Sequence, residues 1–169
     1  MEKLQDKLGE IQGIGRKKNL KKLHITLMTL KVNPEEREAV ESSFTKVGEK
    51  FSEITGKGGF LLGLKGLEVG DGELPPVFIR IELGLEILSI LRGLLLDELH
   101  AFNTDSRFTP HVTLFGECSL EPVKRNELFK TADQIPTQAI SVKSMSLRQR
   151  KSQQSEQEPL VNRVIQFQF

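Results

Sequence analysis

Two short segments share one alternating pattern, and this pattern limits the possible folds of the chain more than any other feature. The first reads Leu-His-Ile-Thr-Leu over residues 23–27, and the second reads Pro-His-Val-Thr-Leu over residues 110–114. Residues two positions apart in a strand point to the same face. We therefore expect a strand over 23–30 with His24 and Thr26 on one face, and a strand over 108–115 with His111 and Thr113 on one face.

The remaining apolar periodicity predicts helices and strands in mixed order. We expect helices from Met1 to about residue 12, over 34–55, over 87–102 and over 121–131, and strands over 60–69, 77–83, 139–150 and 160–169. The apolar stripe predicted for the second helix consists of Val40, Phe44, Val47, Phe51 and Ile54. Gly63 and Gly66 indicate bulges. This order predicts an α+β fold with mainly antiparallel sheets.

Composition excludes several classes of protein. The chain has 169 residues, 37% of them hydrophobic, and no apolar run near the ~18 residues that a membrane span needs. The first residues are charged and have no apolar core, so we expect no signal peptide. One cysteine excludes an intrachain disulfide framework, so we expect a cytoplasmic or nuclear protein. The net charge of +1 disfavours binding of nucleic acid by overall charge.

The residue types of the two segments suit phosphoryl chemistry. Histidine is the side chain that gains or loses a proton near neutral pH, so two histidines can act as a general base and a general acid. Threonine hydroxyls beside them can donate hydrogen bonds to a phosphate oxygen. Such a site needs no metal and no cofactor. The simpler alternative is a pair of half-buried strands whose outer faces are polar.

The two His-x-Thr segments, about ninety residues apart, resemble the motifs of the two-histidine (2H) phosphoesterase superfamily. The stretch Arg-Phe-Thr-Pro-His-Val-Thr-Leu-Phe over 107–115 is similar to the second motif of the LigT-like and A-kinase anchoring protein central-domain subgroup. The resemblance extends from about Leu23 to Phe169. It implies a bilobed α+β fold in which mainly antiparallel sheets line a central cleft, helices lie outside, and each half offers one His-x-Thr.

The resemblance also implies an activity and its residues. It implies a metal-independent phosphodiesterase that hydrolyses a 2′,3′-cyclic phosphate or a related RNA or oligonucleotide end. By matching position, His24 and His111 form the acid–base pair, and Thr26 and Thr113 are the phosphate ligands. The expected partner is an RNA 3′ end or a nucleotide, with no membrane and no metal. The alternatives are a non-catalytic module that binds a nucleotide or RNA end, and a protein-interaction domain.

Four further residues are weaker candidates for substrate binding. Arg107 and Phe108 precede the second motif, where Phe108 could stack on a base. Arg148 and Arg150 end a predicted strand and could reach a phosphate. For Arg148 and Arg150 a plain surface role is the favoured interpretation, and for Phe108 a core role is at least as good.

We expect residues 1–169 to form a single domain of this type. Members of the superfamily usually open with an apolar strand before the first helix, and this chain shows none. We expect a monomer. The missing strand could leave an open sheet edge, which favours strand exchange, so a strand-exchanged dimer is the alternative.

Overall fold

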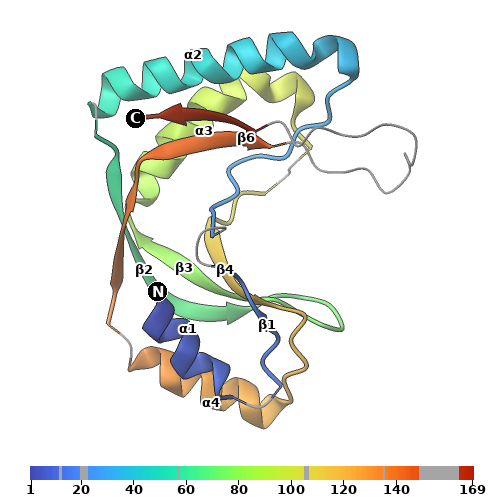
Figure 1. Ribbon diagram of the computed structural model, residues 1–169, viewed down its shortest axis with the longest axis vertical. Helices are drawn as coiled ribbons and strands as arrows, with labels where there is room; N and C mark the ends of the chain where they lie inside the picture. The colour runs from blue at the N-terminus through green and yellow to red at the C-terminus, as the bar shows by residue number, and fades with distance from the viewer. Residues whose placement is uncertain (12, 20–22, 57, 105–106, 135, 149–163) are drawn as a thin grey trace. The chain divides into compact units, whose positions relative to one another are not determined.

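The computed structural model describes residues 1–11, 13–19, 23–56, 58–104, 107–134, 136–148 and 164–169 (Figure 1). The chain forms two compact units, and each is assembled from three separate segments. Unit 1 comprises residues 1–27, 61–86 and 106–140, and unit 2 comprises residues 28–60, 87–105 and 141–169. Both units combine helices with antiparallel strands, which confirms the predicted α+β class.

Most of a five-stranded sheet, with the order β1-β4-β3-β2-β5, belongs to unit 1. Its strands are β1 (Arg16–Lys17), β2 (Phe60–Val69), β3 (Val77–Leu83), β4 (His111–Gly116) and β5 (Gln138–Val142). The hairpin of β2 and β3 has the bounds that the sequence predicts, because the turn between them is rich in glycine and proline. The register shifts between Lys65 and Leu67, where Gly66 is the extra residue, so the predicted bulge at Gly66 is confirmed.

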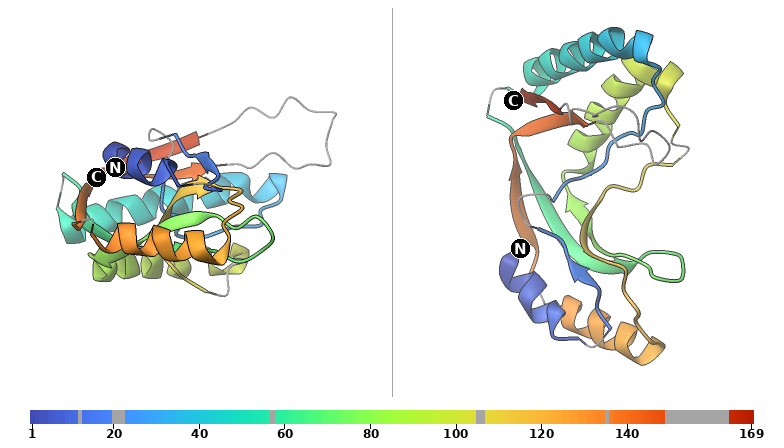
Figure 2. Two further views of the ribbon diagram at one scale, coloured as in Figure 1. Left: turned by 90° about the horizontal axis from the view of Figure 1, so that it is seen from below. Right: turned by 45° about the vertical axis from the view of Figure 1, so that its right-hand side comes forward.

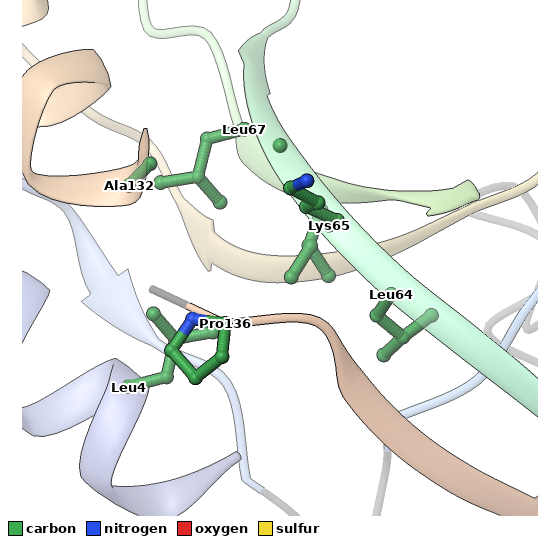
Figure 3. Close-up of a pocket in the computed structure, with 8 residues that line it drawn as sticks. Leu4, Leu64, Lys65, Leu67, Ala132 and Pro136 are labelled. Atoms are coloured by element: carbon green, nitrogen blue, oxygen red, sulfur yellow. The ribbon is translucent and has the colours of Figure 1, made fainter. Parts of the chain in front are cut away.

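Two helices cover the apolar face of this sheet, and they lie side by side in the ribbon views (Figure 1 and Figure 2). They are α1 (Glu2–Gly9) and α4 (Pro122–Asp133), close to the helices predicted from Met1 and over 121–131. Apolar residues of α1, α4 and β2 pack together between the helices and the sheet. Here Leu4, Leu67, Ala132 and Pro136 are among the residues around a cavity of about 10 Å³ (Figure 3). A cavity of this size barely holds one water molecule, so the helices and β2 pack closely here.

Unit 2 is built on two longer helices and a strand pair. The helices are α2 (Arg37–Thr55), preceded by the 3₁₀ turn η2 (Pro34–Glu36), and α3 (Leu85–Leu99), followed by the turn η3 (His100–Phe102). The strands β6 (Ser144–Arg148) and β7 (Val164–Gln168) pair antiparallel and contact α2. Asn33 begins the first of these helical segments as predicted, because its backbone N–H bonds the Glu36 carboxylate in a capping box.

Three expectations about elements are wrong. Residues 23–29 form no strand, and only a single bridge joins Leu30 to Asn103. The strand predicted over 139–150 is divided into β5 and β6, which belong to different sheets. Ile54 leaves the apolar stripe of α2, since it is 58% exposed while the other four members are buried.

Candidate functional site

Strand β4 carries the second His-x-Thr segment with the predicted alternation. His111 and Thr113 are half-buried, whereas Val112 and Leu114 are buried. The side chains that flank them in the sheet come from β3, where Arg80 is directly opposite His111 and Phe78 is directly opposite Thr113. Directly opposed residues point to the same face of a sheet. His111 and Thr113 therefore belong to the face opposite the α1–α4 core.

A bulge ends this regular alternation at Leu114. Thr113 pairs with Phe78, but Phe115 pairs with the adjacent Val77, so β4 has one more residue than β3 at this point. Leu114 and Phe115 are consecutive and are both buried. A bulge re-aims side chains in this way. It leaves His111 and Thr113 on the polar face while two large apolar side chains next to them enter the core.

The first His-x-Thr segment comes after β1 in the chain, and its residues 23–27 belong to no helix or strand. His24 and Thr26 are exposed, whereas Leu23, Ile25 and Leu27 are half-buried. The predicted alternation is present in the exposure, although the predicted strand is not. Both His-x-Thr segments belong to unit 1, whereas the resemblance implied one in each half.

A buried glutamine of α1 forms hydrogen bonds to the backbone at the junction of β1 and β4. Gln5 of α1 is fully buried, and its Nε2 donates to the carbonyl oxygens of Lys18 (3.0 Å) and Leu114 (3.1 Å). The Lys18 N–H also donates to the Leu114 oxygen at 2.8 Å. These bonds fix the chain where it leaves β1 for the first His-x-Thr segment. They also fix β4 just after Thr113.

Two contacts orient the His111 ring. Its Nδ1 lies 2.8 Å from the carbonyl oxygen of Thr109, and a carbonyl only accepts, so Nδ1 carries the hydrogen in this contact. The ring of Phe78 lies against the imidazole, with centroids 4.4 Å apart and planes inclined by 37°. With Nδ1 engaged, Nε2 is the nitrogen that can take or give a proton.

The structure adds two neighbours of His111, Phe78 and Arg80, that the sequence interpretation did not include. The alternation of β3 could have indicated that these two residues share a face. Its buried residues are Val77, Ile79 and Ile81, and residues 78, 80 and 82 are more exposed. The sequence does not show which of these side chains is opposite His111, because the register depends on the bulges.

The remaining predicted residues are distributed differently. Arg107 is exposed and Phe108 is half-buried, and both lie in unit 1 a few residues before β4. Arg148 ends β6 in unit 2, and its Nε donates to the Ser146 hydroxyl at 3.2 Å. Arg150 lies outside the described residues.

The described residues provide neither a cluster of metal ligands nor a membrane-spanning helix. Among the described residues, no group of three or more His, Cys, Asp or Glu side chains could hold a metal ion. No helix in the described part of the chain is long and apolar enough to cross a membrane. A surface cavity of about 430 Å³ in unit 2, between α2 and β7, includes none of the predicted site residues.

Comparisons with known proteins place the fold. No family model and no curated protein matches the chain. Solved structures match over 99% of the chain. They include the Thermus thermophilus protein TT0787 (19% identity, 92% of that chain, TM-score 0.53), Escherichia coli LigT in its apo form (16%, 88%, 0.51) and a phosphoesterase (18%, 89%, 0.50).

The chain therefore has the α+β fold of a class of phosphoesterases. More particularly, it has the LigT-like fold, so the likeness to 2H phosphoesterases that the His-x-Thr segments indicate is confirmed at the level of the fold. The A-kinase anchoring protein subgroup stays a prediction.

Proposed function

We propose that this protein is a metal-independent phosphodiesterase that hydrolyses a 2′,3′-cyclic phosphate or a related RNA or oligonucleotide end. The observation that carries the proposal is the polar face of β4, where His111 and Thr113 stand together with the ring nitrogen Nε2 available for proton transfer. The second segment supports it, because His24 and Thr26 are exposed in the same alternation. The LigT-like fold, which a phosphoesterase shares, adds support.

In this proposal His24 and His111 divide the proton transfers. One imidazole takes a proton from water as the water oxygen bonds to phosphorus. The P–O bond to the leaving oxygen breaks, and the other imidazole gives that oxygen a proton. Thr26 and Thr113 donate hydrogen bonds to the phosphate oxygens, on which negative charge grows in the transition state. The step consumes one water and leaves a phosphomonoester and a hydroxyl.

The alternative function is a module that binds a nucleotide or RNA end without turnover. The same polar face favours it, since a His and a Thr that bind a phosphate need not hydrolyse it. Calorimetry with AMP beside a turnover assay separates the two functions. Binding without turnover supports the binding module, and the absence of both supports a protein-interaction domain.

The decisive experiment measures hydrolysis of a nucleoside 2′,3′-cyclic phosphate in the presence of EDTA. We expect turnover to persist with the chelator, to have a bell-shaped pH profile, and to fall by ~10²-fold or more in His24→Ala and in His111→Ala. His100→Ala is the matched control, because His100 is exposed on η3 in unit 2 and should leave the rate unchanged. Full loss with EDTA, or a wild-type rate in His24→Ala, contradicts the proposal.

A further inference from the structure

The nearest cation to His111 in the sheet register is Arg80 of β3. The two residues are directly opposed, which puts their Cβ atoms about 4.5–5.5 Å apart on one face. The Arg80 side chain is 57% exposed, so a ligand on this face can reach the guanidinium. Thr113 is on the same face two residues along β4. A cation, an imidazole and a hydroxyl are thus adjacent on unit 1.

The guanidinium is engaged only loosely. Its Nη1 lies 3.2 Å from Oε1 of Glu68, a residue of β2 whose side chain is 39% exposed. An ion pair as exposed as this one contributes little and exchanges readily. A phosphate presents oxygens in the spacing that the guanidinium fork binds with two parallel hydrogen bonds. Phosphate can therefore replace Glu68 as the partner of Arg80.

The bulge in β2 makes room for this arginine. Gly66 has a φ of 71°, and a Cβ at this position would come within 2.8 Å of Nη2 of Arg80. The guanidinium thus lies over a residue that has no side chain. A residue with a side chain here would be strained and would press on the guanidinium.

We propose that Arg80 binds the substrate phosphate beside His111, and that Glu68 is the counter-ion it exchanges for that phosphate. This inference rests on the proposed function of the same face and adds a substrate-binding residue to it. Arg80 supplies the positive charge that a threonine hydroxyl lacks. Glu68 lowers the affinity for the phosphate, because its carboxylate competes with the ligand for the same guanidinium.

The experiment measures the dissociation constant of AMP by calorimetry and KM for a nucleoside 2′,3′-cyclic phosphate. We expect Arg80→Met to weaken AMP binding by about tenfold or more, and Arg80→Lys to weaken it less. Glu68→Gln should tighten binding, by no more than about fivefold, and the double variant should bind like Arg80→Met. KM should follow the same order.

The controls come from the neighbouring ion pair on the same strands. Lys65 and Glu82 lie 3.8 Å apart with side chains 49% and 46% exposed, so their removal changes charge in the same way. Lys65→Met and Glu82→Gln should alter binding by less than about twofold. Equal losses in Lys65→Met and Arg80→Met overturn the inference, because overall charge would then explain both.

The remaining outcomes separate this inference from the proposed function. If Arg80→Met binds AMP as tightly as the wild-type protein does, the role of Arg80 is overturned and the proposed function is not affected. Arg80-dependent binding without hydrolysis keeps Arg80 as the phosphate ligand and overturns only the hydrolase. If the wild-type protein binds no AMP and hydrolyses no cyclic phosphate, both proposals are wrong.

Discussion

The ring of Phe78 packs on the imidazole of His111, and the two centroids are 4.4 Å apart. Phe78 belongs to β3 and is directly opposite Thr113, so it reaches His111 across a diagonal of the ladder. The Thr109 carbonyl accepts from Nδ1 at the other edge of the imidazole. His111 is thus fixed by an aromatic face and by one hydrogen bond, which leaves Nε2 for the proton transfer that we propose.

We expect Phe78→Leu to lower turnover of a cyclic phosphate by about 2–10-fold, because an aromatic pair contributes about 0.5–1.5 kcal/mol beyond its burial. Leucine keeps an apolar side chain on β3, so the fold should persist. Phe129→Leu on α4 is the control and should leave turnover unchanged. Unaltered turnover together with unaltered NMR resonances of the His111 ring would show that Phe78 does not position it.

Gly15 is predicted to be irreplaceable at the start of β1. A Cβ at this position would lie 1.9 Å from the carbonyl oxygen of Gly116, a distance that the backbone cannot tolerate. Gly15→Ala should therefore push β1 from β4 and cost about 1–3 kcal/mol, which corresponds to a drop of several degrees in Tm.

Gly9→Ala is the matched control for Gly15. Apart from its chain neighbours and the backbone of α1 itself, no described heavy atom lies within 4 Å of a Cβ at Gly9. Alanine there should leave Tm unchanged or raise it slightly, since it favours a helix by up to about 1 kcal/mol over glycine. Equal Tm values for the two variants would mean that the approach of Gly15 to Gly116 is not needed.

Gln5→Leu should destabilise the β1–β4 junction. The Lys18 carbonyl loses the Gln5 amide that bonds it in a part-buried position, and the loss of one such hydrogen bond costs about 0.5–1.5 kcal/mol. We expect faster amide hydrogen exchange at Lys18 and a lower midpoint of denaturation. Gln134→Leu, on the exposed end of α4, should change neither. Unchanged exchange at Lys18 would contradict the bridging role of Gln5.

The ion pair between Lys50 of α2 and Glu98 of α3 predicts a pH dependence. The hydrogen bond from Lys50 Nζ to Glu98 Oε1 (2.6 Å), followed by the attraction of the two charges, lowers the pKa of Glu98 and raises the pKa of Lys50. The contribution of Glu98 is complete above its unfolded-state pKa and is lost as the pH falls through its lowered pKa. That of Lys50 is complete below its unfolded-state pKa and is lost as the pH rises through its raised pKa.

Lys50→Met should move the pKa of Glu98 upward in an NMR titration, toward the ordinary value of a glutamate. Lys46→Met is the control, since the Lys46 charge is only the last of the causes that act on Glu98. An unmoved Glu98 titration in Lys50→Met would show that the pair does not form in solution.

Local sequence chemistry predicted the elements whose limits are set by their own residues. The β2–β3 hairpin begins and ends as expected, because glycines and prolines leave little choice for the turn between Val69 and Val77. The alternation around His24 predicted which side chains are exposed. It did not predict the absence of a strand, since ladder hydrogen bonds require a partner that the pattern does not name.

The residues of the candidate site could be named from the sequence, but their neighbours in the sheet could not. His111 and Thr113 stand out as a motif, and the structure keeps them on one face. Phe78 and Arg80 became candidates only when the register put them opposite those residues, and that register shifts at an extra residue in β4. Local sequence patterns do not predict where a bulge shifts the pairing of two strands.

The interleaving of the two units determines when each can be completed during synthesis. The chain passes from one unit to the other five times, and the last segment of unit 1 is residues 106–140. Strands β2 and β3 are therefore made well before β4, which lies between β3 and β1 in the sheet. Until β4 emerges from the ribosome, the edge of β3 and the apolar face of the hairpin lack their final partners. Pairing between strands that are far apart in the sequence slows folding. It also leaves apolar surface exposed to aggregation in the meantime, so we expect the nascent chain to depend on chaperones.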